Sequence, residues 1–298
     1  MKTVAILGPT ASGKTDLAID LAKESGAYIL SLDSLSVYKE IDIASAKPSL
    51  SQREEARHFG IDEIEVNSRF NVGIFIDIFK TASTAAKKED RPLIIVGGTG
   101  FYLKVLLEGI SDLPPLTQEA ADRVSQLLKD PVKAYEALKK IDSVYADSIS
   151  GSDRYRIEKG LQIYFSTSEP PSIYFRNNPP KPLLDSVALY EIAIDKERLI
   201  ERIEARTAKM FSDGLVDEVA NLEYRYGREP NPMKAIGIRE VLEYFDAKMS
   251  LEETKKRVAI HTRQLAKRQR IFNKTQFPPH PLLDKEKLFG EAMKLLNR

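Results

Sequence analysis

The strongest constraint on the fold is a glycine-rich segment close to the start of the chain, GPTASGKT at residues 8–15. A short apolar and β-branched run, residues 3–7, comes directly before it. Residues 14–24 overlap its end, and their apolar side chains recur at helical spacing. A strand, a GxxxxGK(S/T) loop and a helix in this order predict a phosphate-binding loop, because the glycines let backbone N–H groups converge on one phosphate.

The residue types within this loop predict a diphosphate or triphosphate ligand. The Lys14 ammonium can reach terminal phosphate oxygens, and the Thr15 hydroxyl can ligate Mg²⁺. The alternative, a glycine-rich turn that only begins a helix, is disfavoured by the strand and the helix around the motif. The residues expected to bind the diphosphate are Gly8, Thr10, Ala11, Ser12, Gly13, Lys14 and Thr15.

The alternation of strands and helices continues along the chain. Residues 28–32 and 93–96 are apolar runs that predict buried strands, and residues 74–88 have helical spacing. Residues 187–194 predict a further core strand. We therefore expect an α/β fold with a P-loop NTPase-like parallel sheet core flanked by helices.

Helical sequence punctuated by proline interrupts this pattern. LPPL at residues 113–116 opens the segment, and a stretch rich in Pro, Ser and Asn closes it. We expect a helical insertion subdomain at 113–185 between two halves of the core, 1–112 and 186–298. The second half is mostly helical, and its periodicity predicts a long final helix over residues 251–273.

One acidic residue follows the second predicted strand. Many P-loop enzymes place a carboxylate at the end of a later strand to position Mg²⁺, but residues 93–96 run into Gly97 and Gly98 instead. Asp33 comes just after residues 28–32, where strand ends in parallel sheets border the ligand crevice. It could act on the ligand, cap a helix or hold Mg²⁺ through water, and the residues alone leave these alternatives open.

The composition excludes several classes of protein. The absence of Cys rules out disulfides, thiolate zinc sites and cysteine nucleophiles, and the three His are far apart in sequence. Any metal is therefore expected to have oxygen ligands. No stretch approaches the roughly 20 apolar residues that span a bilayer, and the first residues lack the apolar region of a signal peptide. We expect a cytoplasmic protein without a membrane partner.

The net charge of +1 hides an uneven distribution. Residues 255–274 contain eight Lys or Arg and no Asp or Glu, which predicts a basic surface and a polyanionic partner. On a helix, basic side chains would form one stripe opposite an apolar face. A solvated face is the alternative, but such faces usually interleave acids. The basic stripe is Lys256, Arg263, Lys267, Arg270 and Lys274, and the apolar face is Val258, Leu265 and Phe272.

Seven segments spread over nearly the whole chain resemble the bacterial tRNA dimethylallyltransferase family. The glycine-rich loop alone is shared with many proteins, whereas DSLSVYK, GGTGFY and TRQLAKRQ are far more specific. The segments are residues 8–15, 32–49, 58–62, 95–110, 152–164, 234–241 and 261–272. The resemblance implies transfer of a dimethylallyl group from dimethylallyl diphosphate to the N6 amine of the adenosine just 3′ of the anticodon, position 37 of tRNA.

The resemblance also implies roles for individual residues. The loop would hold the donor diphosphate, with Mg²⁺ at Thr15, and Thr10 would lie near the bridging oxygen. Asp33 would be the catalytic base, and Thr99 and Arg123 would contact tRNA near the reaction, with Arg123 assisting catalysis. The full tRNA-binding set is Asp33, Ser34, Leu35, Ser36, Thr99, Arg123, Arg156, Lys159 and Arg239, to which the basic stripe adds Arg263, Lys267 and Arg270. The implied partners are the tRNA anticodon stem-loop and dimethylallyl diphosphate, with Mg²⁺ as cofactor, and we expect a monomer.

The chain departs from the family at four positions. Lys159 replaces an Arg, which loses the bidentate phosphate fork, and Ile238 replaces a Tyr, which loses a ring with a hydroxyl. Glu240 replaces a Gln, and Phe272 replaces a Trp. The departures concern expected tRNA contacts and leave the donor loop unchanged.

Three alternative functions fit parts of the sequence. A P-loop small-molecule kinase is disfavoured by the missing strand-end acid and by the basic segment. A prenyltransferase acting on free adenosine nucleotides would not need that basic segment. A non-catalytic RNA-binding protein would not need to retain Lys14, Thr15 and Asp33 together.

Overall fold

The structure is a computed structural model that describes residues 1–184 and 186–297. The predicted boundary at residue 185 and the chain end at 298 lie outside the described residues. The chain forms two compact units, Met1–Leu106 with Leu184–Arg298, and Leu107–Leu183. The division into domains around an insertion at 113–185 stays a prediction.

The first unit is built on a six-stranded sheet in which all neighbouring strands are parallel. The strand order is β3-β2-β4-β1-β5-β6. The strands are β1 Thr3–Leu7, β2 Tyr28–Ser31, β3 His58–Phe59, β4 Leu93–Gly97, β5 Ala188–Ile192 and β6 Leu282–Leu283. The predicted α/β fold with a parallel sheet is confirmed. The sequence patterns do not predict β3 and β6, because strands of two residues are too short to show a period.

The strand register brings three loops to one edge of the sheet. Leu7 pairs with Gly97 in β4, and Ser31 pairs with Val96. Because the strands are parallel, the segments after β1, β2 and β4 all leave at the same carboxyl edge. The phosphate-binding loop, Asp33 and the Gly97–Thr99 segment therefore lie at that edge.

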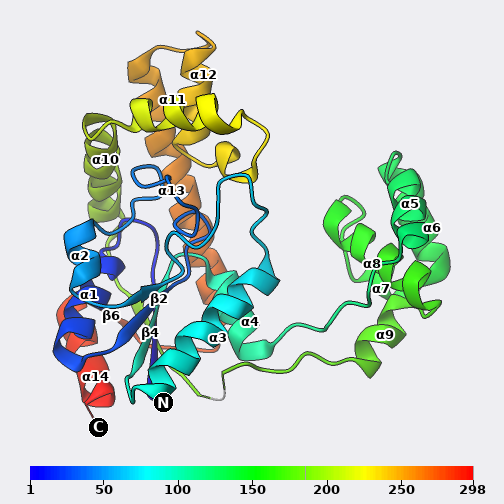
Figure 1. Ribbon diagram of the computed structural model, residues 1–298, viewed down its shortest axis with the longest axis horizontal. Helices are drawn as coiled ribbons and strands as arrows, with labels where there is room; N and C mark the ends of the chain where they lie inside the picture. The colour runs from blue at the N-terminus through cyan, green and yellow to red at the C-terminus, as the bar shows by residue number, and fades with distance from the viewer. Residues whose placement is uncertain (185, 298) are drawn as a thin grey trace. The chain divides into compact units, whose positions relative to one another are not determined.

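Helices flank the sheet of the first unit, but α11 and α12 lie away from it (Figure 1). They are α1 Lys14–Ser25, α2 Leu50–Glu54, α3 Val72–Lys88, α4 Gly100–Glu108, α10 Lys196–Ser212, α11 Leu215–Tyr226, the 3₁₀ helix η1 Asn231–Lys234, α12 Ile238–Phe245, α13 Leu251–Gln276 and α14 Lys285–Leu296. No helix within residues 1–184 and 186–297 is long and apolar enough to cross a bilayer.

The prediction that the long basic helix is the final helix is wrong, because helix α14 follows it. Leu288, Ala292 and Leu296 of α14 are buried in the same core cluster as Ile6 and Leu17. Their spacing of four residues is the signal of an amphipathic helix that the sequence analysis missed.

The long helix α13 begins at a capping box and packs on α10. The Ser250 hydroxyl accepts from the Glu253 N–H at 3.3 Å, and the Glu253 carboxylate accepts from the Ser250 N–H at 2.8 Å. Ala259 and Ala266 pack with Ile203 in one buried cluster. This small-residue face fixes α13 beside α10.

The basic stripe on α13 is largely exposed, but it is not free of acidic neighbours. Arg263 is partly buried, and its Nη1 lies 3.7 Å from Glu204 Oε1 of α10. The three apolar residues of the opposite face are buried or partly buried. The exposed members of the stripe are Lys256, Lys267, Arg270 and Lys274. The role of the stripe in RNA binding stays a prediction.

The second unit is helical. Its helices are α5 Gln118–Leu127, α6 Pro131–Ile141, α7 Ser143–Asp147, α8 Arg154–Thr167 and α9 Pro171–Asn177. Its own core consists of Val124, Leu128, Ala134, Leu138, Ala146, Ile157 and Leu161. Gly160 permits a close approach in this core, because a Cβ there would lie 2.7 Å from Cε1 of Tyr145.

Candidate active site

The phosphate-binding loop connects β1 to α1. Gly13, at the start of α1, has a φ of 85°, a conformation that glycine adopts without strain. Lys14 Nζ donates to the Pro9 carbonyl at 3.2 Å, so its ammonium folds back over the loop. The Ser12 hydroxyl is buried and has no hydrogen-bond partner. A buried hydroxyl without a partner in such a loop fits a phosphate oxygen.

Two helices from the far half of the chain hold Thr10 in this loop. Arg206 of α10 donates from Nη2 to Thr10 Oγ1 at 2.7 Å. Gln269 of α13 accepts from the Thr10 N–H at 2.8 Å. One turn before Arg206, Arg202 donates to the Ser12 carbonyl at 2.9 Å. Arg202 and Arg206 were not predicted from the sequence, although their spacing of four residues places both on one face of a helix.

The loop region has an excess of positive charge. Burial lowers the pKa of Lys14 from 10.5 to about 8, the nearby Arg206 guanidinium acts in the same direction, and Asp33 opposes both. Burial also lowers the pKa of Arg206, again against the effect of Asp33. Two desolvated cations facing one carboxylate favour an anionic ligand.

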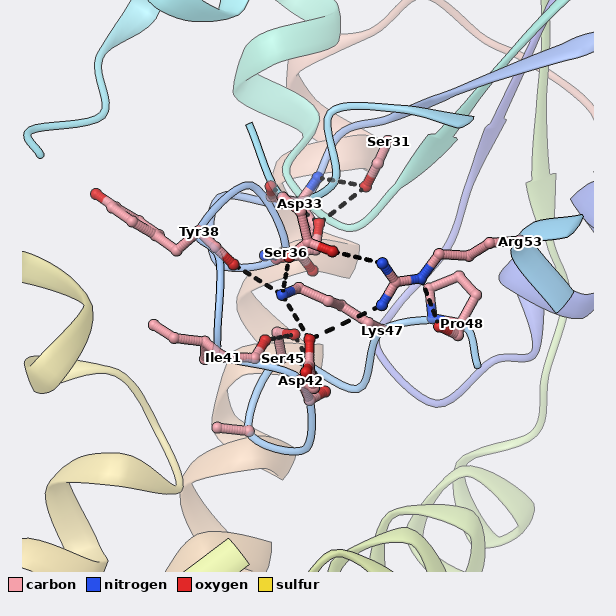
Figure 2. A network of polar contacts seen from close by, with 12 residues as sticks. Ser31, Asp33, Ser36, Tyr38, Ile41, Asp42, Ser45, Lys47, Pro48 and Arg53 are labelled. Carbon is pink, nitrogen blue, oxygen red and sulfur yellow. Dashed lines mark hydrogen bonds and ion pairs between the residues drawn. The ribbon is translucent and has the colours of Figure 1, made fainter. Parts of the chain in front are cut away.

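Asp33 is oriented by the turn that follows β2. Its Oδ1 accepts from the N–H groups of Leu35 at 2.8 Å and Ser36 at 3.2 Å. Ser31 Oγ accepts from the Asp33 N–H at 3.3 Å (Figure 2). Both bonds to the carboxylate use Oδ1, so Oδ2 remains available to a ligand. Asp33 thus caps a turn and not a helix, because the next helix begins only at Leu50. Its action on a ligand stays a prediction.

A cavity of about 250 Å³ lies at the carboxyl edge of the sheet, between this loop, the segment after β2 and helix α13. The sequence-predicted residues that line it are Thr10, Lys14, Thr15, Asp33, Ser34, Leu35, Ser36 and Thr99. The other predicted loop residues, Gly8, Ala11, Ser12 and Gly13, belong to the same loop. Lining residues that the sequence analysis missed include Lys47, His58, Arg206, Met210, Thr262 and Gln269. Donor-site and acceptor-site candidates therefore share one cavity.

Arg239 belongs to a polar cluster between α12 and α13. It donates to Glu240 at 2.6 Å, and the buried Glu240 carboxylate also accepts from the Gly237 N–H at 2.7 Å and lies 2.7 Å from His261 Nδ1. Burial acts to raise the pKa of Glu240, but these three partners hold that pKa below its usual value. The cluster adjoins Ile236, which lines the cavity.

Three further predicted residues lie in the second unit. Arg123 of α5 stacks over the Phe165 ring, 4.4 Å from its centroid. Arg156 of α8 pairs with Asp153, and Lys159 donates to Gln162 at 2.8 Å. Their contacts to tRNA stay predictions, as do those of Arg239 on α12 and of Arg263, Lys267 and Arg270 on α13.

The donor groups at the cavity suit a hard cation bound together with phosphate. Thr15 supplies a hydroxyl and Asp33 a carboxylate, and Mg²⁺ is usually held by one or two protein oxygens, phosphate oxygens and water. Within residues 1–184 and 186–297, no three His, Cys, Asp or Glu side chains cluster as a metal site. The residues therefore fit a metal that arrives with a diphosphate.

The parallel sheet and the cationic phosphate-binding loop define an α/β P-loop protein, and it lacks the strand-end carboxylate with which many P-loop enzymes position Mg²⁺. The family model for IPP transferase matches residues 36–276. A tRNA dimethylallyltransferase of Nautilia profundicola is 53% identical over 274 residues, which cover 92% of this chain and 92% of the relative. The chain belongs to the IPP transferase family.

Two solved structures are similar along most of the chain. The full-length tRNA isopentenylpyrophosphate transferase of Bacillus halodurans has a TM-score of 0.71 and 26% identity, and the match covers 99% of this chain and 95% of that one. A eukaryotic dimethylallyltransferase acting on tRNA has a TM-score of 0.82 and 28% identity, with 91% of this chain and 70% of that one covered.

Proposed function

We propose that the protein transfers a dimethylallyl group from dimethylallyl diphosphate to the N6 amine of adenosine 37, just 3′ of the anticodon in tRNA, and releases diphosphate. The observation that carries the proposal is the shared cavity, in which Lys14 and Arg206 accompany the phosphate-binding loop and Asp33 faces the same space. Membership of the IPP transferase family supports the same reaction.

The loop would bind the donor and stabilise the leaving group. As the allylic C–O bond breaks, its electron pair leaves with the diphosphate, and Lys14, Arg206 and the loop amides stabilise the growing negative charge. Because Thr10 Oγ1 accepts from Arg206, the Thr10 hydroxyl hydrogen is free to donate to the bridging oxygen. The loop thus favours the transition state over the bound donor.

Asp33 would take the proton from the acceptor. The N6 lone pair of adenine is delocalised, so the amine is a weak nucleophile, and a positioned base helps by taking its proton while the N–C bond forms. As the N–C bond forms, the nitrogen becomes acidic and an ordinary carboxylate suffices. Oδ1 keeps Asp33 in place through Leu35 and Ser36, while Oδ2 accepts the proton.

Mg²⁺ is the proposed cofactor, with Thr15 as its ligand from the loop. When bound, it would neutralise diphosphate charge during departure of the leaving group. The protein residues supply the remaining positive charge through Lys14 and Arg206.

The tRNA would present its anticodon stem-loop to the cavity. Stacking shields the N6 amine inside a folded loop, so the target nucleotide would be extruded towards Asp33. The proposed contacts are Ser34 to Ser36 and Thr99 at the cavity, the exposed stripe of α13, and Arg123, Arg156, Lys159 and Arg239. We further propose that the enzyme acts as a monomer in the cytoplasm.

Mass spectrometry of tRNA nucleosides tests this function. After incubation of the protein with unmodified tRNA, dimethylallyl diphosphate and Mg²⁺, we expect N6-dimethylallyladenosine at position 37 only. Product from free adenosine nucleotides but not from tRNA would indicate the nucleotide prenyltransferase. A thermal shift with ATP and Mg²⁺ but none with the prenyl donor would indicate the kinase, because a ligand at a hundred times its Kd stabilises the fold by about 2.7 kcal/mol.

A further inference from the structure

The segment that follows Asp33 contains a fully buried ammonium group. The Lys47 side chain is only 1% exposed, and its Nζ donates to the Tyr38 carbonyl at 2.7 Å, to Asp42 Oδ1 at 2.8 Å and to Asp62 Oδ1 at 2.6 Å. An ammonium has three donors, so all of them are used within the protein. Figure 2 shows Tyr38 and Asp42 converging on Lys47. A buried charge of this kind requires such complete pairing.

Hydrogen bonds connect Lys47 to the proposed catalytic base. Asp62, its closest partner, donates from its backbone N–H to the Ser36 carbonyl at 3.1 Å. Ser36 in turn donates from its N–H to Asp33 Oδ1 at 3.2 Å. Lys47 is therefore connected to the Asp33 carboxylate by three successive hydrogen bonds, which pass through Asp62 and Ser36.

Asp62 is kept ionised for this role. Burial acts to raise its pKa, but hydrogen bonds from Lys47 and Arg53 hold the pKa of Asp62 below its usual value. Arg53 Nη1 donates to the second carboxylate oxygen, Oδ2. Charge-assisted hydrogen bonds are stronger than those between neutral groups, and here they join Asp62 to both Lys47 and Arg53.

Helix α11 holds the same segment from another side. The Glu218 carboxylate accepts from three successive backbone N–H groups, those of Asp42 at 2.9 Å, Ile43 at 2.7 Å and Ala44 at 2.9 Å. Residues 44–48 line the cavity beside Asp33. The cavity wall is thus fixed at one end by Glu218 and at the other by Lys47.

We propose that Lys47 is a positioning residue for prenyl transfer, which holds residues 33–48 as a preformed wall so that Asp33 meets the acceptor amine. The inference rests on the proposed function, because it requires Asp33 to act on the acceptor. Lys47 lines the cavity, but its Nζ has no proton left for a substrate, so the ammonium acts through Asp62 and Ser36. Displacing a reacting group by about 1 Å costs on the order of a hundredfold in rate.

Lys47→Met tests the proposal, because the methionine side chain is only one atom shorter and the substitution removes the charge and all three hydrogen bonds. We expect the single-turnover rate with saturating tRNA to fall about a hundredfold, while the dissociation constant for dimethylallyl diphosphate stays within about twofold of wild type. Donor binding at full stoichiometry shows that the variant is folded. The matched control is Lys39→Met, which removes an exposed ion pair with Glu65 in the same segment and should keep the wild-type rate.

Glu218→Gln is the second variant, because it replaces one of the two accepting oxygens by an amide donor. It should lower the single-turnover rate in the same way as Lys47→Met, again with unchanged donor affinity. A lower melting temperature with a wild-type rate in both variants would make Lys47 a stabilising residue only and overturn the proposal. If Asp33→Asn keeps the wild-type rate as well, the proposed function of the site is wrong. If Asp33→Asn is slow while Lys47→Met and Glu218→Gln keep the wild-type rate, only the positioning role of Lys47 is wrong.

Discussion

Raising the pH from 7 to 9 should weaken donor binding about tenfold, because Lys14 loses its charge in this interval. A group with a pKa of about 8 is charged in roughly one molecule in ten at pH 9. The bound diphosphate favours the charged form and raises the Lys14 pKa, so binding at pH 9 takes up about 0.9 proton. Affinity therefore falls as the pH rises. The tenfold loss corresponds to about 1.36 kcal/mol.

Calorimetry with dimethylallyl diphosphate in buffers of different ionisation enthalpy measures both quantities. Two other groups at or near the site keep their charge state in this interval, because burial lowers the pKa of His58 below its usual value and raises that of Tyr102 to about 12. Lys14→Met is the control, and it should bind weakly with an affinity that is constant between pH 7 and 9. A wild-type affinity that is equally constant, with no proton uptake, would refute the assignment of Lys14 to the diphosphate.

Three further results are expected. Arg206→Gln should weaken donor binding by roughly ten- to a hundredfold in calorimetry, because a charge-assisted bond and the support of Thr10 are lost; unchanged binding would place the diphosphate elsewhere. Replacing Arg263, Lys267 and Arg270 by Gln should reduce the slope of log affinity for tRNA against log salt concentration by about three units. An unchanged slope would mean that the stripe does not contact tRNA phosphates. A 2-aminopurine at tRNA position 37 should brighten on binding as it unstacks; constant fluorescence in a confirmed complex would argue against extrusion.

The parts of the site that the sequence predicts are those whose chemistry is local. The loop from Gly8 to Thr15 carries its glycines, lysine and threonine within eight residues, and Asp33 directly follows a strand. The parallel order of the strands then brings both to one edge. Local spacing and sheet topology therefore suffice to predict that the two lie together.

Contacts between distant parts of the chain could not be predicted in this way. Arg206 and Gln269 reach Thr10 from α10 and α13, and nothing in the sequence near Thr10 indicates these partners. Lys47 reads as an ordinary surface lysine, because its burial depends on Asp62 and on the packing of the whole segment. Tertiary packing decides such contacts.

The central claim is that Asp33 serves as the base in the cavity where the phosphate-binding loop holds the donor. Asp33→Asn tests it most directly, because the amide oxygen can still accept from Leu35 and Ser36 while the base is lost. In a single-turnover assay with saturating donor and tRNA, we predict a rate lower by about a hundredfold or more, with donor affinity close to that of wild type. A wild-type rate for Asp33→Asn would contradict the account.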